Sequence, residues 1–102
     1  MYSIRILFVI TVFLVSLSTH AEIVEVKNLG NIDLSDYQCS FVSSSVVNRI
    51  CFNDKKSSLI LLFRSNYYAY CRIPKSVVNE LASASSIGQY FNANIKGNYD
   101  CR

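Results

Sequence analysis

Four cysteines that follow an apolar leader restrict how this chain of 102 residues can fold. Residues 1–21 have the order of a cleavable export signal: a positive charge at Arg5, an apolar run over 6–17, and a polar stretch that ends at Ala21. The apolar run is shorter than the roughly 20 residues that span a bilayer, so we expect no stable membrane anchor after cleavage. Residues 22–102 are then predicted to be periplasmic or secreted.

All four cysteines lie in the predicted exported part: Cys39, Cys51, Cys71 and Cys101. An even number in a small exported chain predicts two disulfides, because a core of this size needs covalent support. Zinc sites place paired ligands two to four residues apart, whereas the intervals here are 12, 20 and 30 residues. We therefore expect disulfides and no metal.

Residues that favour strands are concentrated in three runs of the central region. The runs are 46–52, 59–64 and 67–73, with turn residues at 53–56 and 65–66. They predict an antiparallel three-stranded meander. A two-residue turn at 65–66 would place Phe63 opposite Tyr68 and Leu61 opposite Tyr70 on one side of the sheet.

Both sides of this predicted sheet are largely apolar, so each needs a cover. After Pro74, with Ser76 as its predicted cap, apolar residues recur at helical spacing as far as Ala84, and a second short helix is predicted over 86–94. We expect these two helices on one side. The N-terminal segment or a partner chain is expected on the other.

The N-terminal part of the exported chain carries weaker signals. Residues 22–27 alternate loosely and predict an edge strand, and residues 28–36 predict a loop. The overall prediction is an α+β fold: a small three-stranded meander packed against two short C-terminal helices, with a disulfide-tethered extension over 22–41.

The predicted meander limits how the cysteines pair. Cys51 and Cys71 lie on its outer strands, so their Cα atoms would be about 9 to 10 Å apart, which is too far for a disulfide. Pairing Cys39 with Cys51 and Cys71 with Cys101 closes the shorter loops and is the preferred arrangement. Pairing Cys39 with Cys71 and Cys51 with Cys101 stays open.

Several motifs between residues 42 and 99 resemble the KTSC domain. They are Val42-Ser43-Ser44-Ser45, Tyr68-Ala69-Tyr70, Ile73-Pro74-Lys75-Ser76-Val77 and the string from Gly88 to Tyr99 that contains Tyr-Phe-Asn-Ala-Asn-Ile-Lys-Gly. The resemblance implies an α+β domain over 42–102, of a kind found alone in small bacterial proteins and appended to some lysyl-tRNA synthetases, with a suggested role in RNA binding. The export signal, the cysteines and the extension mark this chain as an exported branch.

The candidate ligand-binding residues are Tyr68, Tyr70 and Arg72, which alternate along the third predicted strand. Two interpretations apply: the tyrosines stack bases while Arg72 holds a phosphate, or they pack beneath the first helix with their hydroxyls at the rim. We favour packing.

Catalysis and cofactor binding are not expected. The only histidine, His20, lies in the leader, so the exported chain lacks the base of a hydrolase triad. Positive and negative charges are dispersed, so nucleic-acid binding is the alternative and not the main prediction. The sequence predicts a binding module whose partner is a protein, with an envelope protein as the preferred version.

Overall fold

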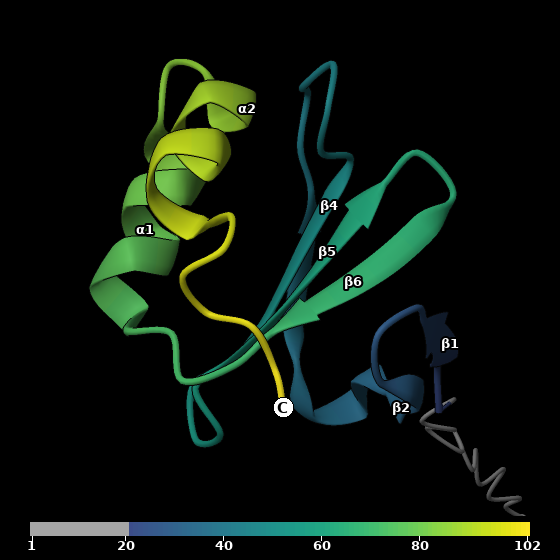
Figure 1. Cartoon of the computed structure of the whole chain (residues 1–102). Coiled ribbons are helices and arrows are strands. Elements are labelled where there is room, and N and C mark those ends of the chain that lie inside the picture. Colours follow the sequence, from purple (N-terminus) through teal and green to yellow (C-terminus); the bar gives the residue numbers. More distant parts are fainter. Residues whose placement is uncertain (1–20) are drawn as a thin grey trace, which may run out of the picture.

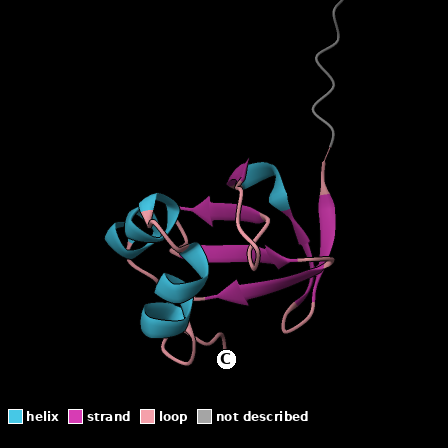
Figure 2. Cartoon of the chain, turned by 90° about the horizontal axis from the view of Figure 1, so that it is seen from above, coloured by secondary structure: helices cyan, strands magenta, loops and turns pink. Residues whose placement is uncertain are grey.

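The computed structural model describes residues 21–102, so the predicted export signal lies outside the described part except for Ala21. In residues 21–102 a mixed sheet carries the helices on one face (Figures 1 and 2). The elements in chain order are β1 (Ile23–Val26), β2 (Gly30–Asp33), the 3₁₀ turn η1 (Leu34–Asp36), β3 (Gln38–Phe41), β4 (Arg49–Asn53), β5 (Ser58–Phe63), β6 (Asn66–Tyr70), α1 (Lys75–Ser83), α2 (Ile87–Tyr90) and the π-helical turn η2 (Phe91–Ile95).

The prediction of a three-stranded meander is wrong. Strands β4, β5 and β6 do form a meander, but it is the middle of a six-stranded sheet with the order β2-β1-β6-β5-β4-β3. Strand β3 pairs antiparallel with β4, and β1 joins β6 in parallel at Val26 and Tyr67. The strand predicted at the edge over 22–27 is therefore an interior strand, and the loop predicted over 28–36 contains β2 and η1.

A side chain extends the junction between β1 and β6. The Asn28 amide nitrogen donates to the Ala69 carbonyl and the Asn28 Oδ1 accepts from the Ala69 N–H, both at 2.9 Å. The amide thus supplies the donor and the acceptor that a neighbouring strand would offer. Together with the hydrogen bond from the Lys27 N–H to the Tyr67 carbonyl, it fastens the N-terminal hairpin to the meander.

The turn between β5 and β6 lies one residue earlier than predicted. Phe63 is opposite Asn66, so the two turn residues are Arg64 and Ser65, and Leu61 faces Tyr68 where Tyr70 was predicted. Arg64 has a φ of 60° and its N–H donates to Asn48 Oδ1 at 2.8 Å. The pairing shifts by two residues, which keeps every side chain on its predicted face.

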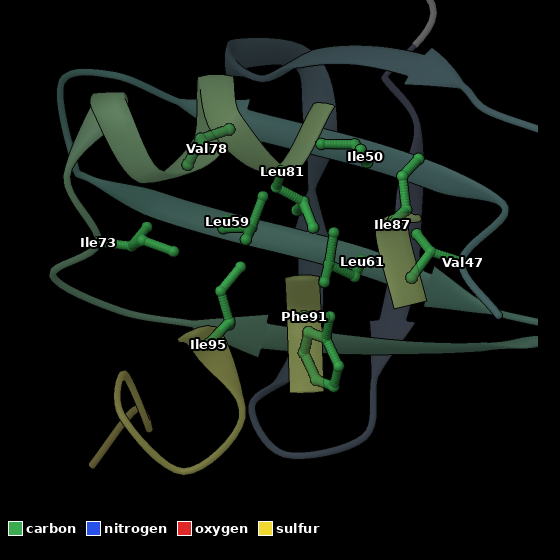
Figure 3. Close-up of a cluster of buried hydrophobic side chains, with 10 residues drawn as sticks. All are labelled: Val47, Ile50, Leu59, Leu61, Ile73, Val78, Leu81, Ile87, Phe91 and Ile95. Atoms are coloured by element: carbon green, nitrogen blue, oxygen red, sulfur yellow. The ribbon is translucent and has the colours of Figure 1, made fainter. Parts of the chain in front are cut away.

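Each of the two faces of the sheet packs against a separate apolar core. The larger core lies between the sheet and the helices (Figure 3), and its buried members are Val47, Ile50, Leu59, Leu61, Ile73, Val78, Leu81, Ile87, Phe91 and Ile95. The smaller core lies on the opposite face, and its buried members are Val26, Leu34, Cys51, Ile60 and Ala69. Of the two predicted covers for that face, the N-terminal segment is the one found in the described chain.

The helices begin close to their predicted starts. Pro74 occupies the N-cap position of α1 without a side-chain hydrogen bond, so the predicted cap Ser76 is wrong. Ser86 caps α2, because its Oγ accepts from the Gln89 N–H at 3.2 Å. The single helix predicted over 86–94 is α2 continued by η2. In the described residues 21–102, no helix has the length and apolar character needed to cross a membrane.

Two disulfides close the fold. Cys39 pairs with Cys51 across β3 and β4, and Cys71 pairs with Cys101. This is the arrangement with the shorter loops, so the alternative pairing is not the one adopted. The first bridge fixes the N-terminal extension to the sheet and the second fixes the C-terminal tail, as predicted.

Candidate binding surface

The structure places Tyr68 and Tyr70 in an aromatic cluster on the helix-facing side of β6. Tyr68 contacts Phe63 edge-on with ring centroids 5.8 Å apart, and Tyr70 contacts Phe91 in the same way at 5.6 Å. Phe63 and Phe91 also touch, at 5.1 Å. Both tyrosines are half-buried. Burial, helped by the nearby Asp100 and Tyr68, raises the pKa of Tyr70 to about 12.

The third predicted site residue does not join the two tyrosines. Arg72 lies beyond the end of β6, and its φ of 57° interrupts the strand alternation. Its guanidinium donates to the Asp100 carbonyl at 2.9 Å, beside the disulfide between Cys71 and Cys101. Arg72 therefore braces the C-terminal tail, and the three residues do not form one exposed platform.

An arginine clamp lies on the opposite face of the sheet. Arg49 on β4 donates two hydrogen bonds to the Glu22 carboxylate, at 2.7 and 3.0 Å, and one to the Tyr67 hydroxyl at 3.0 Å. The Arg49 side chain is only 12% exposed. The hydrogen bonds from Arg49 lower the pKa of Glu22, and those to Glu22 and Tyr67 raise the pKa of Arg49. Both groups are thus held in their charged forms.

The clamp supports an exposed aromatic side chain at the edge of the sheet. The Arg49 guanidinium carbon lies 4.9 Å from the centre of the Phe41 ring, within the range of a cation–π contact. Phe41 is nevertheless 74% exposed, the largest exposed fraction among the large apolar side chains of the described chain. We call strand β3, which ends at Phe41, the β3 edge. Sequence reasoning missed it, although Tyr37, Cys39 and Phe41 alternate with polar residues as a strand requires.

A charged hollow adjoins the start of the β3 edge. Its volume is about 380 Å³, and it lies where Gln38, the turn after β4 and the first residue of α1 meet. Lys55, Lys56 and Lys75 line it together with Asp36 and Asp54, and Lys75 approaches Asp54 at 3.7 Å. Cations therefore outnumber carboxylates in this hollow, which we call the lysine-rich hollow.

Comparison with known proteins assigns the domain. The KTSC domain model matches residues 43–99, which include β4 to η2 and exclude the first three strands. The chain belongs to the KTSC family. The crystal structure of a KTSC domain protein from Yersinia pestis is 33% identical, with a TM-score of 0.62, over 65% of this chain and 94% of the other. No curated protein matches the chain. Phe41 and Glu22 thus precede the part that matches the family model.

Proposed function

We propose that this protein is a small exported KTSC protein that binds a protein of the cell envelope. The observation that carries the proposal is Phe41, a large aromatic side chain that is 74% exposed and held against the Arg49 guanidinium. Aromatic and arginine side chains supply much of the binding energy at protein interfaces. A ring that is already restrained loses less side-chain entropy when a partner covers it.

The arginine clamp gives Phe41 a fixed support. Arg49 is held by Glu22 from the start of the extension and by Tyr67 from β6, so its guanidinium has little freedom to move. The disulfide from Cys39 to Cys51 fixes the strand that carries Phe41. Support on two sides favours an anchor that meets its partner in one conformation.

The two disulfides support the envelope as the location of the partner. Disulfides persist in oxidising compartments and are rare in the reducing cytosol. The apolar leader over 6–17 is the second support, because it has the order of an export signal. A partner met after export is then a protein of the envelope or of the medium.

The experiment is site-specific photo-crosslinking in the native host. A photoreactive amino acid replaces Phe41 in one strain and Ala82, on the exposed side of α1, in a matched control strain. We expect a discrete crosslinked protein from position 41 that is absent from position 82. The crosslinked species is then identified by mass spectrometry, and cell fractionation with alkylation of free thiols establishes where the oxidised protein resides.

Two results would overturn the proposal. The first is an equal, diffuse pattern from positions 41 and 82, which would mean that Phe41 has no preferred partner. The second is recovery of the uncleaved chain from the cytosol with four free thiols.

A further inference from the structure

The β3 edge has unused backbone hydrogen-bonding groups. The Val42 N–H donates to the Asn48 carbonyl, which fixes the phase of the ladder between β3 and β4. Because hydrogen-bonded and non-hydrogen-bonded pairs alternate in antiparallel strands, Gln38 and Ser40 pair with β4. The N–H and C=O groups of Cys39 and Phe41 therefore point away from the sheet, where the described chain places no further strand.

Apart from its short length of four residues, this edge lacks the devices that usually prevent strand pairing. Natural edge strands are protected by charged side chains, proline or bulges. Residues 38–46 contain neither a charged residue nor proline, and β3 pairs with β4 without a bulge. The other edge of the sheet, β2, begins with Gly30 and ends with the charged Asp33. The β3 edge is thus the more receptive of the two.

The lysine-rich hollow gives an added strand a direction. A strand that pairs antiparallel with β3 runs from Phe41 toward Gln38, so its C-terminal end arrives at the hollow lined by Lys55, Lys56 and Lys75. A carboxylate placed there is attracted by the three lysines and repelled by Asp36 and Asp54, and the attraction is the larger because the cations outnumber the carboxylates. Near the other end of β3, the residue of the added strand that lies opposite Phe41 is beside the exposed Phe41 ring.

We propose that the β3 edge binds the C-terminal segment of a partner protein as an added antiparallel strand, with an apolar residue beside Phe41 and the terminal carboxylate in the lysine-rich hollow. Binding of this kind takes its affinity from backbone hydrogen bonds and its specificity from alternate side chains and from the captured carboxylate. The inference rests on the proposed function and specifies its partner.

The test uses displayed random peptides with free C-termini, selected on the oxidised, exported protein. Enriched sequences are synthesised as free acids and as C-terminal amides and titrated by fluorescence anisotropy. We expect the acid to bind at least about fivefold more tightly than the amide, as expected for a few exposed charge pairs. The difference should disappear in the double variant Lys55→Gln and Lys56→Gln, and persist in the control Lys96→Gln.

Backbone pairing is tested on the unaltered protein by N-methylating the peptide one residue at a time. Methylation should abolish binding at alternate positions only, because alternate N–H groups face β3. The variant Phe41→Pro removes one outward N–H and should weaken every selected peptide, whereas Phe41→Ala should weaken those with an apolar residue at the paired position. Circular dichroism and thiol counts check that both variants fold.

Several outcomes would overturn strand addition. They are no enriched peptide, equal binding of acid and amide, no alternation in the methylation scan, and a self-associated dimer that Phe41→Pro dissolves. If crosslinks from position 41 persist while these peptides fail, strand addition alone is rejected. If the crosslinks are also absent, the proposed function is rejected with it.

Discussion

Removing each disulfide separately tests whether covalent links hold this fold together. In the chain-entropy model, a bridge stabilises by restricting the unfolded chain, more so for a longer loop. Cys39 and Cys51 are 12 residues apart, and Cys71 and Cys101 are 30 apart. The model gives about 3 kcal/mol for the first bridge and about 3.6 kcal/mol for the second.

Packing changes this order. Cys51 is fully buried in the smaller core, so its replacement by alanine adds roughly 1 kcal/mol for lost contacts and the space left behind. Cys101 is only half-buried, and its tail keeps the hydrogen bond from the Cys71 N–H to the Tyr99 carbonyl. We therefore expect losses of about 4 kcal/mol for Cys39→Ala with Cys51→Ala and at most about 3.6 kcal/mol for Cys71→Ala with Cys101→Ala.

The assay is urea unfolding of the oxidised protein and the two double variants, with hydrogen exchange as a second measurement. Small domains have total stabilities of about 5 to 15 kcal/mol, so either loss is a large share. The variant without the Cys71 bridge should also lose exchange protection locally in residues 98–102. A loss below about 1 kcal/mol in both variants, with unchanged urea dependence, would refute the argument that this core needs covalent support.

Four further results follow from the geometry and charges of the described chain. A Cβ at Gly88 would lie 2.9 Å from Val46 Cγ2, so Gly88→Ala should destabilise the protein by about 1 kcal/mol net of its gain in helix propensity. Val46→Ala should remove the clash. An equal loss from Gly88→Ala with Val46 and with Ala at position 46 would contradict the clash. The lowered pKa of Glu22 contributes stability at neutral pH that is lost as the pH falls through that pKa. Glu22→Gln should remove this part of the acid dependence, which is less than about 1 kcal/mol because Glu22 is exposed. An unchanged pH profile of the free energy of unfolding would contradict the clamp. The pKa of Tyr70, raised from 10.0 to about 12, gives stability that is complete below pH 10.0 and declines as the pH rises to about 12. The hydrogen bond to Glu80 raises the pKa of Tyr90 to about 12 as well, so Tyr70→Phe should lower the tyrosinate absorbance step near pH 12 by about half and reduce the decline in stability. An unchanged step would contradict the raised pKa of Tyr70. Titration with single-stranded RNA and DNA at two salt concentrations should give flat curves, whereas binding that weakens steeply with salt would favour the nucleic-acid alternative.

The centre of the fold was predictable because its strands are apolar on both faces and its helices follow Pro74. The predicted register between β5 and β6 was wrong by two residues, because Arg64, and not a glycine or asparagine, adopts the positive φ in the turn. Of the N-terminal strands, only β1 was predicted, and as an edge strand; its interior position and strand β2 were not predicted. Each has four residues, and the junction with β6 depends on one parallel pair and on the side chain of Asn28.

The candidate site was less predictable than the fold. Alternation along β6 selected Tyr68 and Tyr70, but alternation alone does not tell which face the helices will cover. The arginine clamp joins Glu22 and Arg49, which are 27 residues apart, and no local pattern links them. Phe41 lies in a run with strand alternation, so the signal was present, but an exposed phenylalanine and a buried one look alike in sequence.

The proposed binding surface combines the extension, which supplies Phe41 and the strand edge, with the matched domain, which supplies Lys55, Lys56 and Lys75. Phe41 and Glu22 lie before residue 43, where the match to the KTSC model begins, whereas Arg49 and Cys51 lie within it. The clamp at Arg49 and the disulfide at Cys51 fasten the extension to the matched part, together with the Asn28 amide on Ala69. It also covers the second sheet face, so the segment that completes the core is the one that creates the β3 edge. We therefore expect partner choice to depend on the extension as well as on the KTSC domain, since a domain that ends its sheet at β4 would present a different edge.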